Sequence, residues 1–457
     1  MVIWYILFFT DMLLWIILAV SVFYILFFAL ASLLPRNLRN QKSKLGLQTS
    51  DLRPQTLDLR TSDRRTSDRR TSDRRTSDRR TSDRRTSDRR ALDRSTSDLS
   101  TFLVLYPAYN EDAVIRSSVE TFLKQDYPRD HYQLVVISDH MTDETNAWLA
   151  LQPITLLTPH FDKSSKAKAL QHAVHELCTM NYELSSKNYV VILDADNVVA
   201  PDFLSHLNAE CQKGYHAIQC HRTAKNADNN IAALDGLSEE INNSIFRRGH
   251  NRVGLSSALI GSGMCFDYQW FADNVDSLDS AVEDRELEAL LMRQGIYIHY
   301  AEDILVMDEK VSNNDNFQRQ RLRWMTGQVQ ALLRMTPYVP RAIATGNINY
   351  LDKTLQQALI PRSILLMVIP LMVVLIQCSM FIVHCSMFTI HSMKWWFLFL
   401  ALIIALLIAI PQQLRSRTIL SKVSALPGLV LRMTCNLMHI KTDNTDFLHT
   451  EHGKQKN

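Results

Sequence analysis

The 457-residue sequence predicts an α/β domain placed between apolar segments near its two ends. From residue 101 onward, short apolar runs rich in β-forming residues alternate with stretches in which apolar residues recur at helical spacing. This alternation is typical of helices packed on a mostly parallel sheet. The predicted strands are Phe102–Tyr106, Leu134–Ile137, Tyr189–Leu193 and Ala217–Cys220, and the clearest helical stretches are Glu111–Gln125 and Lys166–Leu177. Ligands bind at the carboxyl ends of such strands, so polar residues that directly follow an apolar run are candidate site residues.

Three segments are apolar enough to predict membrane spans: Val2–Leu34, about Leu359–His384 and about Trp395–Ile410. The first is too long for the apolar region of a cleaved signal peptide and lacks a basic start. We therefore predict that it stays in the protein as an anchor.

Basic residues near the ends of these segments predict their orientation. Arg36 follows the first segment, Arg362 lies at the start of the second and Arg415 follows the third, whereas the short connection carries only Lys394. Cytoplasmic flanks of membrane spans are enriched in Lys and Arg. We therefore expect an integral, multi-pass protein of the inner or cell membrane, with its N-terminus outside and its central body in the cytoplasm.

The chain thus divides into five parts: an anchor (1–35), a linker (36–100), the α/β domain (101–335), a juxtamembrane segment with two spans (336–411), and a cytoplasmic tail (412–457). Within the linker, residues 61–90 are six copies of Thr-Ser-Asp-Arg-Arg, which have nothing apolar to bury and predict disorder. Weak adhesion of their arginines to anionic lipid headgroups is an alternative. In the tail, the interrupted apolar stretch Ala425–Ile440 predicts an interfacial helix, with a fourth span as the alternative.

The overall charge and the cysteines exclude some classes of function. Lys and Arg number 50 and Asp and Glu 47, and the net charge of +3 does not point to nucleic acid as a partner. The seven cysteines form no C-x-x-C pair and no zinc-site spacing. Reduced cysteines of this kind suit a cytosol-facing body better than a disulfide-bonded secreted one.

Two carboxylates end the third predicted strand. Tyr189–Leu193 runs directly into Asp194-Ala-Asp196, which places two acids one residue apart at the edge where ligands bind. Oxygen ligands at this spacing suit Mg²⁺ or Mn²⁺, which takes its other ligands from water and phosphate. Strand-end capping by solvated acids is the alternative, since the D-x-D pattern alone is common.

Other polar residues occupy the same predicted edge. The first strand runs into Pro107, Tyr109 and Glu111, and the second ends at Asp139, whose carboxylate could accept a hydrogen bond from a nucleotide base. Lys166 begins a helix, where it could meet a diphosphate together with the helix N-terminus. A helix-capping role for Asp139 and a solvated position for Lys166 are the alternatives.

Three further groups complete the candidate site. Gly261, Ser262 and Gly263 permit a close approach of the backbone to a ligand. Glu283 and Asp284 open a helical stretch, and Asp284 is a candidate general base for an acceptor hydroxyl, although acids at helix starts also complement the helix dipole. The third group consists of Gln320, Arg323 and Trp324. Its arginine could bind a diphosphate and its tryptophan could stack on a sugar ring. The alternative is an ordinary juxtamembrane helix, in which basic and aromatic residues are common.

In this order, the motifs resemble the family 2 glycosyltransferases, specifically the membrane-bound branch that contains cellulose, chitin, hyaluronan and poly-N-acetylglucosamine synthases. The resemblance covers about residues 101–335. It implies a GT-A fold, an inverting mechanism and a nucleotide-sugar donor, a UDP-sugar or a similar one. Two positions depart from the usual pattern: Ser138-Asp139-His140 after the second strand, and Val282 before Glu283-Asp284.

The resemblance also implies roles for individual residues. Asp196 coordinates the metal, with Asp194 contacting metal or nucleotide, and Asp284 is the catalytic base. The donor site includes Pro107, Tyr109, Glu111, Asp139 and Lys166, and the acceptor and diphosphate region includes Gly261, Ser262, Gly263, Glu283, Gln320, Arg323 and Trp324.

The sequence does not decide whether the acceptor is a glycan or a lipid. The polysaccharide-synthase resemblance predicts transfer to a glycan for envelope or extracellular polysaccharide synthesis. Three spans can scarcely enclose an export channel, so a lipid acceptor is the alternative, and polymer export would need an oligomer or a partner. A catalytically inactive sugar-binding membrane scaffold is a third hypothesis, against which the retained Asp194, Asp196 and Asp284 argue.

Overall fold

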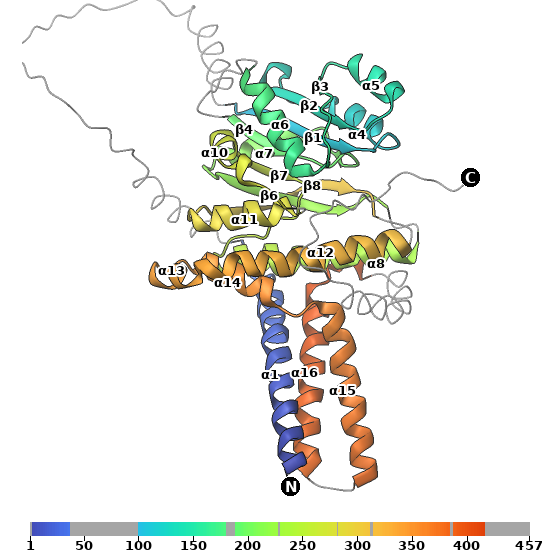
Figure 1. The fold of residues 1–457 in the computed structure, drawn as a ribbon, viewed down its shortest axis with the longest axis vertical. Helices are drawn as coiled ribbons and strands as arrows, with labels where there is room; N and C mark the ends of the chain where they lie inside the picture. The colour runs from blue at the N-terminus through green and yellow to red at the C-terminus, as the bar shows by residue number, and fades with distance from the viewer. Residues whose placement is uncertain are drawn as a thin grey trace, which may run out of the picture.

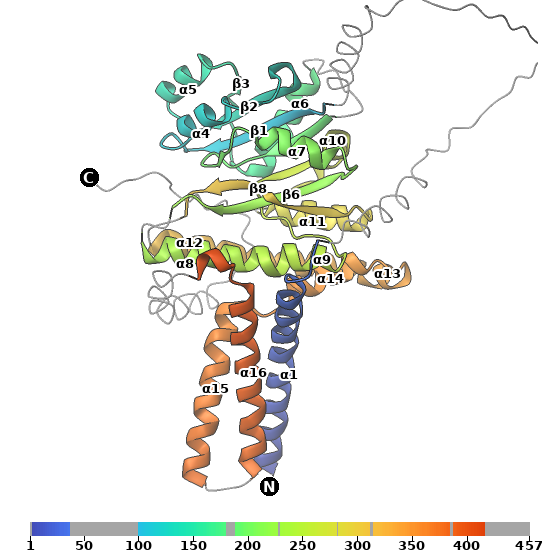
Figure 2. The ribbon, with the colours of Figure 1, turned by 180° about the vertical axis from the view of Figure 1, so that it is seen from behind.

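The computed structural model describes residues 2–36, 99–179, 188–226, 229–280, 282–310, 314–383 and 387–415. The predicted repeats at 61–90 and the predicted interfacial helix at 425–440 lie outside these residues. The described chain forms three levels along the long axis of the molecule (Figure 1). A sheet covered by helices lies at one end, a layer of transverse helices follows, and three long helices form the other end. Figure 2 shows the same order from behind.

The sheet is mixed, and its described part has eight strands in the order β3-β2-β1-β4-β7-β6-β8-β5. The strands β3, β2, β1 and β4 run parallel to one another. Strand β7 runs antiparallel between β4 and β6, and β5 runs antiparallel to β8. This confirms the predicted α/β fold and the four predicted strands. The strands are β1 (Thr101–Tyr109), β2 (Tyr132–Asp139), β3 (Thr155–Leu157), β4 (Asn188–Ile192), β5 (Val198–Val199), β6 (Ala217–Ala224), β7 (Met264–Asp267) and β8 (Ile298–Asp308).

Helices cover both faces of this sheet because its strands bury apolar side chains on both sides. One core holds residues of β1, β2, α4, α5 and α7, and the other holds residues of β1, β4, α6, α10 and α11. These helices are α4 (Ile115–Phe122), α5 (Asp143–Ala150), α6 (Lys166–Thr179), α7 (Phe203–Cys211), α10 (Tyr268–Asn274) and α11 (Glu283–Arg293). Short 3₁₀ turns are η1 (Arg129–His131), η3 (Val275–Ser277), η4 (Thr336–Tyr338) and η5 (Gln412–Leu414).

The transverse layer separates the sheet from the long helices (Figure 1). Its apolar side chains, among them Leu234, Leu237 and Phe317, belong to the same core as the long helices. The layer therefore packs directly on the bundle. It contains α8 (Asn230–Asn242), the π-helix η2 (Asn243–Gly249), α9 (His250–Arg252), α12 (Asn314–Met335), α13 (Val339–Ala344) and α14 (Ile348–Ala358).

The bundle consists of α1 (Val2–Ala31), α15 (Arg362–Val383) and α16 (Met387–Ala409). In the described chain, these three helices are long and apolar enough to cross a membrane, as the sequence predicts. They expose large apolar side chains outward, including Phe9, Phe27, Leu371 and Phe397. The N-terminal end of α1 lies at the end of the bundle far from the sheet (Figure 1).

Helix α1 joins the rest of the protein at both of its ends. Near its start, Asp11 forms an ion pair with Lys394 and accepts a hydrogen bond of 2.8 Å from Trp395 Nε1, both on α16. Near its end, Tyr24 donates a 2.8 Å hydrogen bond to Asp352 Oδ1 on α14, and the Phe28 ring stacks on His250 at 3.6 Å.

At this end, the backbone of α1 also touches η2. A Cβ atom at Gly249 would lie 2.3 Å from the carbonyl oxygen of Phe28, so only glycine permits this approach. The helix is therefore packed onto the catalytic half of the chain rather than merely tethered to it.

Candidate active site

One cavity of about 640 Å³ begins at the carboxyl edge of the sheet and continues to the helices of the bundle. Its apolar end includes Ile25, Leu366, Leu406 and Ile410, from all three long helices. The predicted site residues that line the cavity are Pro107, Tyr109, Glu111, Asp139, Lys166, Asp194, Asp196, Gly261, Glu283, Asp284, Gln320, Arg323 and Trp324.

Ser262 and Gly263 do not line this cavity; they support it from behind. The Ser262 hydroxyl donates to Asn197 Oδ1 and accepts a 3.4 Å hydrogen bond from the Asp194 amide. Gly263 has a φ of +64°, and a Cβ atom there would lie 3.0 Å from Val306 Cγ2. The Gly263 amide donates a 2.9 Å hydrogen bond to the Ile192 carbonyl at the end of β4, and the Gly263 carbonyl accepts one of 2.7 Å from Cys220 of β6.

Four carboxylates gather where three strands end. Asp194 and Asp196 follow β4, Glu111 follows β1 and Glu309 follows β8. Asp196 is buried, and its Oδ2 accepts a 2.8 Å hydrogen bond from the Glu309 amide. Burial, and then the charges of Asp196 and Asp194, raise the pKa of Glu111 to about 9. A cation bound among these carboxylates would reduce the repulsion between their negative charges.

The donor atoms of this acidic cluster fit Mg²⁺ or Mn²⁺. They are carboxylate oxygens, the ligands that both ions accept. No three His, Cys, Asp or Glu side chains among the described residues form a metal-binding group by themselves. The fit is therefore to a cation held by Asp194 and Asp196 that completes its shell with phosphate oxygens and water.

Lys166, the first residue of α6, connects three parts of the site. Its Nζ forms an ion pair with Asp194, donates a 2.5 Å hydrogen bond to the carbonyl oxygen of Gly261 and lies 3.5 Å from Glu283 Oε1. Burial disfavours its charge, but Asp194 and Glu283 outweigh that effect and raise the pKa of Lys166. Lys166 thus remains a cation beside the acidic cluster.

Asp284 lies at the start of α11, beside the Gly261 turn. Its Oδ1 accepts a 2.9 Å hydrogen bond from the Arg285 amide. Gly261 has a φ of +78°, and a Cβ atom there would lie 3.7 Å from Asp284 Oδ2. The absence of a side chain at Gly261 leaves this carboxylate open to the cavity. Burial is the largest influence on neighbouring Glu283 and raises its pKa.

Asp139 lies at the other side of the site, at the end of β2. It is 2 % exposed, and its Oδ1 is 2.5 Å from His140 Nδ1. His140 adopts a positive φ of +57°, and its ring lies 5.4 Å from that of Tyr109. These residues form a buried acceptor beside two rings, which suits a planar base with N–H donors.

Helix α12 brings Gln320, Arg323 and Trp324 to the cavity from the transverse layer. Arg321 lies between them in sequence and stacks at 4.5 Å on the Trp324 ring, while it pairs with Asp235 of α8. The sequence-based reasoning missed Arg321. Arg321 could have been found from the sequence, because it immediately follows Gln320 within the same basic-aromatic motif.

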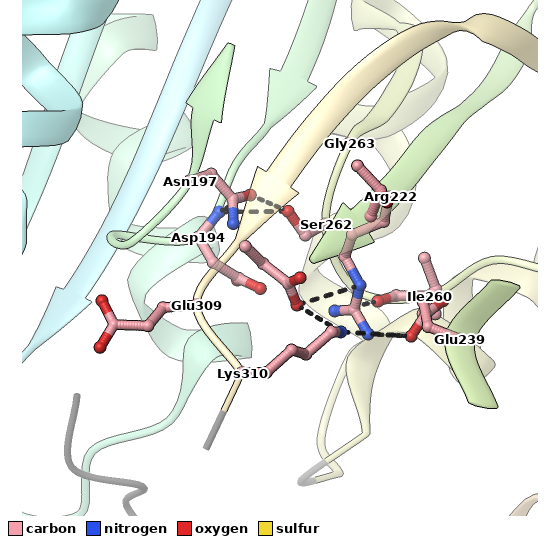
Figure 3. A network of polar contacts seen from close by, with 12 residues as sticks. Asp194, Asn197, Arg222, Glu239, Ile260, Ser262, Gly263, Glu309 and Lys310 are labelled. Atoms are coloured by element: carbon pink, nitrogen blue, oxygen red, sulfur yellow. Dashed lines mark hydrogen bonds and ion pairs between the residues drawn. The ribbon is translucent and has the colours of Figure 1, made fainter. Parts of the chain in front are cut away.

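A buried ion network that the sequence did not reveal lies below the acidic cluster (Figure 3). Arg222 of β6 donates a 3.0 Å hydrogen bond to Glu239 of α8, and its Nε lies 3.5 Å from Asp308. Lys310 lies 3.0 Å from Asp308 and 3.6 Å from Glu239. One signal was available: the apolar run of β8 ends in Asp308-Glu-Lys310, the same strand-end pattern as the other motifs.

Comparison with known proteins bears on the family of this fold and site. Residues 100–327 match the model of the family described as "Glycosyltransferase like family 2". Two curated relatives are beta-monoglucosyldiacylglycerol synthases. That of Nostoc sp. is 25% identical over 236 residues and that of Trichormus variabilis 24%, each match covering 50% of this chain and 49% of the relative. The chain therefore spans about half the length of these relatives.

Two solved structures are also similar. A mannosyltransferase from Pyrobaculum calidifontis, in complex with GDP-Man and Mn²⁺, has a TM-score of 0.42 at 17% identity, covering 68% of this chain and 87% of that chain. A glucosyl-3-phosphoglycerate synthase from Mycobacterium tuberculosis has a TM-score of 0.36 at 17% identity, covering 51% and 79%. From the family match over its α/β domain, this chain belongs to the family 2 glycosyltransferases.

Proposed function

We propose that this enzyme transfers a sugar from a nucleotide-sugar donor to the hydroxyl group of a membrane-embedded acceptor, with inversion at the anomeric carbon. The observation that carries the proposal is the cavity. It joins the acidic cluster, Lys166 and Asp284 at one end to Leu366, Leu406 and Ile410 of the bundle at the other. A lipid acceptor fits a cavity that is polar at the sheet and apolar among membrane helices.

The residues of the site supply each requirement of a single displacement. Asp139 accepts from the base, and Lys166 with the N-terminus of α6 binds the phosphates. Asp284 takes the proton of the acceptor hydroxyl as its oxygen attacks the anomeric carbon. A divalent cation bound by Asp194 and Asp196 would offset the negative charge of the departing nucleoside diphosphate. Arg323 adds positive charge from the opposite wall.

Basic residues at the ends of the long helices support one membrane orientation. The ends of α1, α15 and α16 that face the sheet carry Arg36, Arg362 and Arg415. Under the positive-inside rule, this supports a cytoplasmic catalytic domain. A glycolipid product also agrees with the names of the two curated relatives, which make beta-monoglucosyldiacylglycerol.

The test uses the full chain in lipid nanodiscs with Mn²⁺, a panel of nucleotide-sugars and extracted lipids. Asp284→Asn is expected to lower turnover about 100-fold or more, because it removes the general base. Asp276→Asn is the matched control, since that side chain is exposed and pairs with His175 on the surface. Equal turnover by wild type and Asp284→Asn would remove Asp284 from this role, and no turnover with any donor would favour the inactive scaffold.

A further inference from the structure

The part of the cavity nearest the bundle carries more cations than carboxylates, and all of these cations are buried except Arg362, which is half-buried. We call it the basic end and define it by five cations and three acids that line the cavity: Arg222, Arg247, Lys310, Arg321 and Arg362, with Asp235, Glu239 and Asp308. Counting one charge each, five cations against these three acids leave a formal excess of +2. The buried Glu288 also lines the cavity and in its ionised form would reduce this excess to +1, but burial raises the pKa of Glu288 and so favours its neutral form. Buried charge without a counterion is costly, so a cavity with this excess favours an anion.

The excess is concentrated at Arg362 and Arg321. Arg362 donates to the Ser238 carbonyl and hydroxyl oxygens, at 3.2 and 3.0 Å. No carboxylate in the part of the chain that the structure describes lies within ion-pair distance of it. Arg321 pairs with Asp235 through one nitrogen, and its buried Nε has no hydrogen-bond acceptor among the described residues.

Ser363 and the start of α15 add neutral donors at the same place. The buried Ser363 hydroxyl also lacks a partner among the residues that the structure describes. Arg362 and Ser363 are the first two residues of a 22-residue helix, whose N-terminal amides carry partial positive charge. A helix N-terminus is suited to a phosphate group when it lies beside an arginine without a carboxylate partner and a serine hydroxyl without an acceptor.

Apolar side chains continue the cavity from this point. Leu366 lies one turn further along α15, and Leu406 and Ile410 approach from α16. A ligand that fills both parts has a phosphate at the start of α15 and an apolar chain along the bundle. In Figure 3, Glu309 of the acidic cluster points away from Arg222 and Lys310, whereas Asp194 lies beside the network.

We propose that the basic end binds the phosphate of a phospholipid, and that this phospholipid is the acceptor. This proposal rests on the proposed function and specifies its acceptor class. A headgroup hydroxyl oxygen forms the new bond to the anomeric carbon, its proton passes to Asp284, and the bond from that carbon to the diphosphate breaks. The nucleoside diphosphate leaves with the electron pair. A neutral diacylglycerol would leave the basic end without its anion.

The experiment compares two lipids that differ by the phosphate-containing headgroup, dioleoylphosphatidylglycerol and dioleoylglycerol. Full-length protein in neutral detergent is incubated with each, and retained lipid is quantified by native mass spectrometry. Wild type is expected to retain the phospholipid at least about tenfold more tightly, a difference of about 1.4 kcal/mol. Arg362→Gln should abolish this preference, whereas Arg362→Lys should keep most of it.

Arg415→Gln is the matched control, because Arg415 also lies at the membrane edge but, among the described residues, its guanidinium donates to the carbonyl oxygens of Leu407 and Ile410 at the end of α16. Equal retention of both lipids by wild type, or an equal loss in Arg415→Gln, would overturn the inference. UDP binding with Mn²⁺ is measured in parallel. If Arg362→Gln weakens UDP binding and spares the phospholipid, the basic end serves the donor diphosphate and the inference is wrong.

Failure of the proposed function has a different signature. In that case no nucleotide-sugar is turned over, or Asp284→Asn turns over as fast as wild type, whatever lipid is retained. If Asp284→Asn is inactive but diacylglycerol alone accepts the sugar, the transferase proposal stands and the phospholipid proposal fails.

Discussion

Lys166 Nζ lies 3.5 Å from Glu283 Oε1 while it also pairs with Asp194, so one partly buried ammonium separates the acidic cluster from the start of α11. Lys166→Met would leave the buried Glu283 and the partly exposed Asp194 without their cation. We expect a loss of about 1–3 kcal/mol in stability, less than for a fully buried ion pair, because solvent screens the charge of Asp194. Thermal unfolding in detergent measures the loss.

The double variant Lys166→Met/Glu283→Gln provides the check on this interpretation. It removes one of the two stranded charges and should recover part of the stability. A double variant that is less stable than Lys166→Met would show that repulsion between the stranded acids is not the cause.

Asp196→Asn tests the metal site. Removing this carboxylate should weaken Mn²⁺ binding in the presence of UDP by at least about 10- to 100-fold, a range seen even for residues behind the direct ligands. Calorimetric titration with Mn²⁺ gives the affinity. Asp202→Asn, at an exposed acid outside the cavity, should bind Mn²⁺ like wild type. Unchanged binding by Asp196→Asn would exclude Asp196 as a ligand.

Gly327 allows α12 to pack closely against Val282, which lies just before Glu283 and Asp284. A Cβ atom there would lie 2.5 Å from Val282 Cγ1, two residues before Asp284. Gly327→Ala should therefore cost about 1–3 kcal/mol by overpacking. Val282→Ala in the same chain should restore the stability and the turnover, because it vacates the contested space. Thermal unfolding and donor turnover are compared in the three variants.

The Asp11–Lys394 pair holds α1 against α16 inside the bundle. Lys394→Met should destabilise the protein by about 3 kcal/mol, since it leaves the Asp11 carboxyl without this cation among apolar helices. The double variant Asp11→Leu/Lys394→Met should be close to wild type in thermal unfolding. A double variant as unstable as the single one would point to lost packing or to the lost Trp395 hydrogen bond instead.

The burial of His250 is expected to make the stability of the protein depend on pH. Burial, and then the charge of Lys353, lower the pKa of His250 to about 4. Between pH 6.5 and 4 the unfolded chain binds a proton at this residue and the folded protein does not, so stability falls as the pH is lowered through this range. The melting temperature should drop from pH 7 to pH 5, and less so in His250→Gln. An equal drop in that variant would assign the effect to other groups.

Much of the fold could be predicted because its signals are local. The strands β1, β2, β4 and β6 are apolar runs of several residues, and the acids that follow them lie where parallel strands end. β7 was missed because its four residues follow the glycines of residues 261–263 and carry no alternation. β5 has two residues, too few for any pattern.

The site divides in the same way. Asp196 and Asp284 belong to compact motifs, and the sequence could indicate them as candidates, although their roles remain predictions. Arg222, Glu239 and Lys310 come from β6, α8 and the end of β8, and each is an ordinary charged residue in its local sequence. Only the folded chain brings Arg222 and Lys310 within 4 Å of both Glu239 and Asp308. The strand-end pattern of Asp308-Glu-Lys310 could therefore have marked Lys310 as a candidate, but not its partners on β6 and α8.

The docking of α1 on η2 has a practical consequence for anyone who wishes to prepare a water-soluble fragment. Cutting the chain after residue 36 would strip Tyr24 from Asp352, uncover the His250 ring and open the glycine contact at residue 249. The remaining enzyme would expose the groove that α1 fills, and with it the wall of the cavity to which Ile25 contributes. The N-terminal helix is thus an integral part of the folded enzyme, and activity assays require the uncut chain.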